Sequence, residues 1–286
     1  MPTFLQYLKS YWELFRLEHG LMYGLAVLVG VFVSDTNYSN LQKIIFAYLT
    51  AVLLQASTFA LNDFFDYEVD IKNKRFDRPL VRGEISKRGA LISSVLLFPL
   101  GLFTALLISL ESFIFATAVS VAGVLYDVKL KEFGIAGNIY VAFSMAAPFI
   151  FGSIVALDSI YSMATILAMI AFFSGLGREI MKGIEDVEGD KLRNVRSVAI
   201  VKGENFASRL SAYFYLLAVL LSFLPVLNPE YLDFKYLIPV AIADLMFFDA
   251  SAKLLRGAKK ESIPKFRKKT LFAMLFGLVG FLLGTF

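Results

Sequence analysis

The chain of 286 residues contains no cysteine, one histidine and one tryptophan. The absence of cysteine excludes disulfide bonds and thiolate metal sites, and a single histidine, His19, excludes sites built from several imidazoles. Any metal site in this chain must therefore depend on oxygen ligands. No recognisable nucleic-acid-reading module is present either, so nucleic acid is not an expected partner.

Hydrophobic residues are abundant instead, at 58% of the chain, against roughly 45–50% in a typical soluble domain. Apolar stretches recur at about 17–25 residues, the length that crosses a bilayer. No cleavable signal peptide is expected, because the first apolar run is long enough to span and lacks a small-residue cleavage site. We predict an all-α, polytopic membrane protein of one domain, residues 1–286, with nine transmembrane helices bundled around a central cavity, at 18–35, 42–62, 90–109, 112–127, 135–157, 160–182, 207–226, 235–254 and 269–285.

The basic residues give this arrangement an orientation. Apart from Lys43 and Lys235, the Lys and Arg residues fall before the first predicted helix, in alternate loops, or, for Arg178, just inside the same face. Positively charged loops stay in the cytoplasm. We therefore expect a multi-pass protein of the cell membrane, with the N-terminus and the loops after even-numbered helices in the cytoplasm and the C-terminus outside.

Two clusters of carboxylates follow long apolar runs. The first contains Asn62, Asp63, Asp66 and Asp70. In a helix, steps of four residues advance only about 40° around the axis, so Asn62, Asp66 and Asp70 share one face. Asp63 lies one turn before Asp66, close to the same face. An uncompensated acid at the centre of a membrane helix costs about 2.5–3.5 kcal/mol on insertion scales, so the cluster needs a compensating charge.

The second cluster repeats this spacing. Lys182, Asp186 and Asp190 are four residues apart, and Asp186 lies 120 positions after Asp66, four predicted helices further along the chain. The repeat suggests an internal duplication that brings two similar acidic rows face to face. A lone Asp-x-x-x-Asp is usually a solvated helix face, but two at cytoplasmic helix ends, each followed by basic residues, favour a binding site.

Magnesium with a diphosphate accounts for both clusters. Mg²⁺ usually binds one or two carboxylates together with phosphate oxygens and water. We expect two or more Mg²⁺ ions, for which Mn²⁺ can substitute, held by Asn62, Asp63, Asp66, Asp70, Asp186 and Asp190. Of these, Asp66, Asp70, Asp186 and Asp190 are the predicted catalytic residues. The basic side chains expected to close over the diphosphate are Lys74, Arg78, Arg82, Lys182 and Arg193.

Other polar residues have two interpretations. Glu18 and His19, at the start of the first predicted helix, are typical of residues at the membrane interface, and Asn138 is typical of a hydrogen bond between helices. In a second interpretation, all three residues line the site of a second substrate, the acceptor of a transferred group. Trp12 is typical of an interface anchor. The 29 Phe and 13 Tyr residues suit a cavity that stabilises an allylic cation.

With these motifs the chain resembles the UbiA family of intramembrane prenyltransferases. Asn62-Asp63-x-x-Asp66-x-x-x-Asp70 is similar to the family's first acidic motif, and Asp186-x-x-x-Asp190 to its second. The family often has Tyr-x-x-x-Lys after the fourth helix. Here Tyr126 is followed by Lys129 and Lys131 at other spacings, and we favour Tyr126 and Lys131 as diphosphate ligands.

The resemblance implies transfer of a prenyl group from a prenyl diphosphate to a lipophilic acceptor in the bilayer, with no obligatory protein partner. The segments 130–138 and 182–190 are most similar to the branch that joins geranylgeranyl diphosphate to geranylgeranylglyceryl phosphate in archaeal ether-lipid synthesis. An aromatic acceptor, such as a quinone or chlorophyll precursor, is the alternative. A cation or phosphate transporter is less favoured, because its acids are expected near the bilayer midplane.

Overall fold

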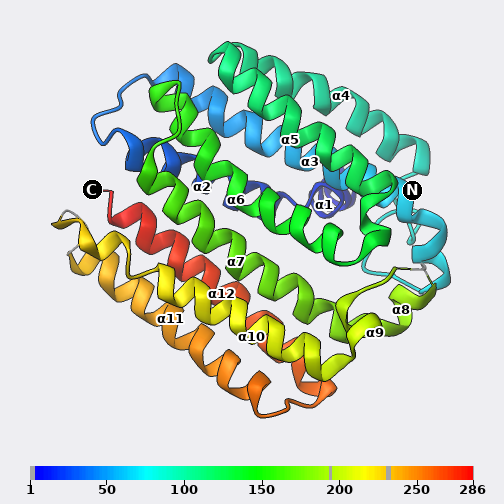
Figure 1. The fold of residues 1–286 in the computed structure, drawn as a ribbon. Helices are drawn as coiled ribbons and strands as arrows, with labels where there is room; N and C mark the ends of the chain where they lie inside the picture. The colour runs from blue at the N-terminus through cyan, green and yellow to red at the C-terminus, as the bar shows by residue number, and fades with distance from the viewer. Residues whose placement is uncertain (1–3, 193–194, 230–232, 286) are drawn as a thin grey trace. The chain divides into compact units, whose positions relative to one another are not determined.

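The computed structural model describes residues 4–192, 195–229 and 233–285, and within these ranges the chain is helical without a β-strand (Figure 1). The predicted all-α class is confirmed. Seven segments are long and apolar enough to cross a membrane: α2 (Leu17–Ser34), α3 (Leu41–Lys72), α4 (Lys87–Leu106), α5 (Leu110–Val128), α6 (Ile135–Leu157), α7 (Ser162–Glu185) and Glu204–Leu227, which begins with α10 (Glu204–Leu221).

Two further long helices, α11 (Phe234–Leu255) and α12 (Ile263–Leu283), form where the last two spans were expected. Unlike the other seven, neither contains an 18-residue stretch with fewer than three charged residues. Helix α11 contains Asp244, Asp249 and Lys253, and α12 contains consecutive basic residues at 267–269. The prediction of nine crossing helices is thus confirmed, by length and composition, for seven.

The longest helix is α3, with 32 residues, or about 48 Å at 1.5 Å per residue. The membrane span predicted here ends at residue 62, and the helix itself continues for ten more residues. The stretch Leu41–Lys72 contains no Gly or Pro, so the helix continues through the acidic cluster. Since the hydrocarbon core is about 30 Å thick, the end of α3 extends past it. Asn40 caps the other end, where its side chain accepts a hydrogen bond from the Lys43 N–H at 3.1 Å.

The chain divides into two compact units, and the first comprises Met1–Val27 and Ser39–Lys129. Here α3 packs against α4, α5 and the short helix α1 (Phe4–Phe15). Hydroxyl pairs join α3 to α4: Thr50 to Thr104 at 2.8 Å, and Ser57 to Ser94 at 3.1 Å. The segment 73–86 contributes to a small buried core, which consists of Leu14, Ala60, Leu80, Ile85 and Ala90.

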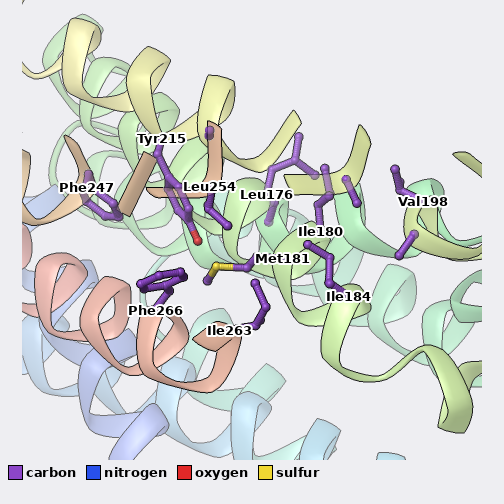
Figure 2. Packing of buried hydrophobic residues seen from close by; sticks show 14 of the residues in the cluster. Leu176, Ile180, Met181, Ile184, Val198, Tyr215, Phe247, Leu254, Ile263 and Phe266 are labelled. Carbon is purple, nitrogen blue, oxygen red and sulfur yellow. The ribbon is translucent and has the colours of Figure 1, made fainter. Parts of the chain in front are cut away.

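The second unit comprises Leu28–Tyr38 and Leu130–Phe286. Its centre is α7, which packs against α6, α10 and α12. Figure 2 shows apolar side chains of α7, α10, α11 and α12 gathered in the core of this unit, with Val198 of α9 (Val198–Lys202) at one end. Helices α7 and α10 approach closely at Gly177, where a Cβ would lie 3.0 Å from the Ser211 carbonyl oxygen. The remaining short elements are η1 (Leu130–Phe133), α8 (Val187–Leu192), η2 (Pro225–Leu227) and η4 (Lys260–Ser262).

Candidate functional site

Three acids of the first cluster lie within the last turns of α3 and are buried. Asp63, Asp66 and Asp70 retain 2%, 8% and 3% of their accessible surface. They belong to one uninterrupted helix, as the spacing predicted. Buried carboxylates require compensating charge or hydrogen bonds, and the neighbours of Asp63 supply both.

Asp63 Oδ1 forms ion pairs with two guanidinium groups. Arg16 Nη2 lies 2.6 Å away and Arg78 Nη1 lies 3.2 Å away. Arg16 connects α1 to α2 in a left-handed conformation (φ 45°), and its guanidinium lies 4.1 Å from the centroid of the Phe59 ring. The other oxygen, Asp63 Oδ2, is buried and has no hydrogen-bond partner among the described residues. Asp63 therefore holds the Arg16 and Arg78 guanidinium groups with Oδ1, and its Oδ2 is left for another ligand.

Asn62 is oriented by an acid on a different helix. Its side-chain Nδ2 donates a hydrogen bond of 2.8 Å to Asp127 Oδ1, on the last turn of α5. Asp127 retains only 2% of its accessible surface. Because the amide nitrogen faces Asp127, the Asn62 carbonyl oxygen points away from that carboxylate and is oriented as a ligand for a cation.

The basic residues after α3 have different environments. Lys74 is exposed and adopts a left-handed conformation (φ 51°). Arg78 reaches back to Asp63. Arg82 is held by Glu84, with Nε–Oε1 and Nη2–Oε2 distances of 2.8 and 2.7 Å, and also by Glu13 of α1. These contacts raise the pKa of Arg82, chiefly through Glu84, and the bond from Arg82 lowers the pKa of the Glu84 carboxyl to about 2.

The second cluster has a different local structure. Helix α7 ends at Glu185, Asp186 is its C-cap, and α8 begins at Val187. The chain bends at Asp186, yet Asp186 N–H still donates to the Lys182 carbonyl at 3.1 Å and Asp190 N–H to the Asp186 carbonyl at 2.8 Å. Asp186 and Asp190 are half-buried. The expectation that this cluster repeats the geometry of the first is wrong in this respect.

Basic groups accompany this cluster as well. Lys182 Nζ lies 3.6 Å from Oε2 of the buried Glu179, and Arg178 Nη1 lies 3.5 Å from Oε1 of the same carboxylate. Glu185 pairs with Arg267 of α12 at 2.6 Å. The predicted diphosphate ligand Arg193 lies outside the described residues.

The other candidates lie at helix ends. Tyr126 is on the last turn of α5 and Lys131 is in η1, both half-buried. His19 Nδ1 lies 3.6 Å from the exposed Glu18 carboxylate, and Asn138 is in the first turn of α6. Their assignment to diphosphate or acceptor stays a prediction.

The oxygen ligands suit a hard divalent cation but are not gathered into a ready-made cage. In the part of the chain that the structure describes, no three His, Asp or Glu side chains come together as a metal site. The reason within the first cluster is its length: Asp63 and Asp70 are seven residues, or about 10 Å, apart along α3. Such a row can place one or two carboxylates on each ion, with other ligands supplied by phosphate oxygens and water.

Sequence reasoning did not assign a site role to Arg16 or Asp127. Arg16 counted only as one of the basic residues that set the topology, although an arginine immediately before an apolar helix is a candidate partner for a buried acid. Asp127 directly follows Tyr126, which the sequence analysis named as a candidate diphosphate ligand. A buried acid at the end of an otherwise apolar helix is the signal that would have found it.

Known proteins are similar to this chain in architecture and in sequence. Residues 24–284 match the UbiA prenyltransferase family. The digeranylgeranylglyceryl phosphate synthase of Archaeoglobus fulgidus is 55% identical over 100% of this chain and 98% of its own length.

Solved structures agree. One from work on digeranylgeranylglyceryl phosphate synthase in membranes is 31% identical, with a TM-score of 0.78 and 98% of both chains covered. A UbiA homologue from Archaeoglobus fulgidus, bound to DMAPP and Mg²⁺, has the same fold at 20% identity, with a TM-score of 0.71 and coverage of 96% of this chain and 98% of its own. This chain belongs to the UbiA prenyltransferase family.

Proposed function

We propose that the protein transfers a geranylgeranyl group from geranylgeranyl diphosphate to geranylgeranylglyceryl phosphate, forming the second ether bond of an archaeal lipid precursor. The observation that carries this proposal is the 55% identity, over essentially all of both chains, to a digeranylgeranylglyceryl phosphate synthase. The matched region includes both acidic motifs and the helices between them, so the same substrates are the simplest inference.

The oxygens of the first cluster fit Mg²⁺. Asp63 Oδ2 is a buried carboxylate oxygen without a protein partner among the described residues, and the hydrogen bond to Asp127 orients the Asn62 carbonyl. We assign Asn62, Asp63, Asp66 and Asp70 to metal binding, together with Asp186 and Asp190. When bound, two or more Mg²⁺ ions, or Mn²⁺ in their place, neutralise the diphosphate as it leaves.

The basic residues then bind the diphosphate directly. We assign this role to Lys74, Arg78, Tyr126, Lys131, Lys182 and Arg193. Arg78 is already held at the first cluster by Asp63. Arg82 is the weakest of the predicted ligands, because its guanidinium already binds Glu13 and Glu84 and must release one of them to reach a phosphate.

The reaction breaks the bond between the prenyl C1 and the diphosphate oxygen and forms a bond between C1 and the acceptor hydroxyl oxygen. Aromatic rings stabilise the allylic cation that develops at C1. The hydroxyl proton passes to a nearby carboxylate or to the released diphosphate. Glu18, His19 and Asn138 remain our candidates for the acceptor end of the site.

Purified protein in nanodiscs tests the proposal. Geranylgeranyl diphosphate is supplied with either geranylgeranylglyceryl phosphate or an aromatic acceptor, and the lipid products are identified by mass spectrometry. We expect digeranylgeranylglyceryl phosphate, and no product in excess chelator. Product with the aromatic acceptor alone would contradict the assignment and favour a quinone-type or chlorophyll-type branch.

We also infer that the N-terminus and the segment 73–86 face the cytoplasm. The excess of Lys and Arg in these regions supports this orientation. Since the chain has no cysteine, single substitutions Phe76→Cys and Asn37→Cys give clean labels. In intact cells a membrane-impermeant maleimide is expected to label position 37 and not 76; the opposite pattern would reverse the orientation.

A further inference from the structure

Helix α1 has an exposed apolar face. Phe4, Leu5, Leu8 and Trp12 retain 76%, 76%, 53% and 47% of their accessible surface. Phe4, Leu8 and Trp12 follow one another at intervals of four, so they form a stripe along the helix. A stripe of large apolar residues that ends in tryptophan is typical of a helix lying in the membrane interface.

The opposite side of α1 packs against the first unit. Ser10 and Leu14 are buried, at 3% and 0% of their accessible surface. Ser10 Oγ donates a hydrogen bond of 2.8 Å to Glu84 Oε2, and Glu13 pairs with Arg82. We call Ser10, Glu13, Arg82 and Glu84 the α1 clasp, because these residues fasten the segment 73–86 to α1.

The position of α1 in the chain favours a location at the membrane surface. Helix α1 ends at Phe15, and the membrane-crossing helix α2 begins at Leu17. Only Arg16, in its left-handed conformation, separates them. A helix joined so directly to the end of a membrane span lies at the level of the lipid headgroups.

We propose that the apolar face of α1 inserts into the headgroup region of the bilayer and that the α1 clasp couples this anchored helix to the segment 73–86. The occupant of the exposed face is thus the lipid surface. Through the clasp, the membrane holds in place the segment from which Arg78 reaches Asp63. This assigns a positioning role to Glu13, which does not contact the acidic cluster and instead pairs with Arg82, the weakest of the predicted diphosphate ligands.

Trp12 is the single tryptophan of the chain, so the protein reports its own membrane contact. Wild-type protein is placed in nanodiscs whose lipids carry bromine either near the headgroup or near the end of the acyl chain. We expect a blue-shifted emission that shallow bromines quench at least about threefold more than deep ones. Trp12 emission that is quenched by aqueous iodide, and by neither of the two brominated lipids, would overturn the proposal that α1 inserts into the bilayer.

The variant Leu8→Gln sharpens this measurement, because it weakens the apolar face and leaves the clasp residues in place. We expect less quenching by shallow bromines and more by iodide. Lys9→Gln is the matched control on the same helix, since the Lys9 side chain is 77% exposed, and its quenching should match that of the wild type. Equal quenching in Leu8→Gln and wild type would count against the proposal.

The coupling requires its own test, which does not depend on activity. In nanodiscs, Glu13→Gln should make the segment 73–86 more sensitive to trypsin by about fivefold, a factor that corresponds to about 1 kcal/mol. Glu13→Arg combined with Arg82→Glu should restore part of the protection at Lys74 and Arg75, the trypsin sites that every variant keeps. Unchanged cleavage in Glu13→Gln, with helical content and Trp12 emission as in the wild type, would show that α1 does not hold the segment.

Discussion

The two acidic clusters have the same residue spacing and different structures. In the first, Asp63, Asp66 and Asp70 are buried on one continuous helix, and Arg16, Arg78 and Asp127 fix the polar groups around them. In the second, the helix ends between Lys182 and Asp190, and both aspartates are half-buried. Spacing alone therefore does not determine how rigidly a row of ligands is held.

Glycine content gives a physical reason for the difference. No glycine lies between Asn62 and Asp70, whereas Gly183 and Gly189 lie on either side of the bend at Asp186. Each glycine costs a helix roughly 0.5–1 kcal/mol relative to alanine. We therefore expect the first cluster to be organised before substrate arrives and the second to adjust when it binds.

The largest expected effect comes from removing one acid of either cluster. Asp66→Ala and Asp186→Ala should each lower kcat/KM by about a thousandfold or more, because in the proposed mechanism each acid helps to hold the metal ions that stabilise the departing diphosphate. Both variants should still insert and purify, which size-exclusion chromatography checks. Full prenyl transfer by either one would mean that its cluster takes no part in the chemistry.

The next largest effect is a difference in how much stability is lost when an arginine partner of each cluster is removed. Arg16→Gln removes the 2.6 Å partner of the buried Asp63 and should lower stability by about 1.5–3 kcal/mol, the range for hydrogen bonds to charged groups. Arg267→Gln removes the 2.6 Å partner of the more exposed Glu185 and should cost less than about 1 kcal/mol. Thermal unfolding in detergent measures both. Equal losses of stability in the two variants would show that the first cluster is not held more rigidly than the second.

Much of this organisation was predictable from the sequence. The helical class, the two clusters and their shared spacing follow from apolar run length and helical periodicity. The spacing of four through Asp70 indicated that the helix continues beyond the predicted membrane span, which ended at residue 62 where the charged residues begin. The pairing of Arg16 with Asp63, 47 positions away, depends on tertiary packing, and no local pattern encodes it.

A smaller, pH-dependent effect concerns the segment that follows the first cluster. Because the folded pKa of Glu84 is lowered to about 2, its contribution to stability is complete above its ordinary value of 4.5. That contribution is lost as pH falls from there through about 2. A fluorophore on Phe76→Cys should keep constant anisotropy down to about pH 4.5 and lose anisotropy below it.

The control for this titration is Glu84→Gln in the same labelled protein. Its anisotropy should already be lower at neutral pH and change less on acidification, with Arg82 and Lys9 as the basic groups that face position 84. Identical titrations of the two proteins would show that Glu84 does not hold the segment.

The smallest expected effect comes from making the second cluster resemble the first. A Cβ at Gly183 would lie 3.4 Å from the Ser197 Cβ, an ordinary contact. Gly183→Ala should therefore raise stability by about 0.5–1 kcal/mol through the last turn of α7. If the second cluster must adjust to its ligand, the same variant should raise KM for the prenyl diphosphate. A lower melting temperature would contradict this reading of the bend.

The central claim is that both clusters bind one diphosphate, and the binding of a non-hydrolysable thio analogue of geranylgeranyl diphosphate tests it most directly. Affinity is measured in nanodiscs with saturating Mg²⁺ for the wild type, Asp66→Ala and Asp186→Ala. The account predicts that each variant loses most of the affinity and that the double variant is little worse than either. Wild-type affinity in one of the single variants would contradict it.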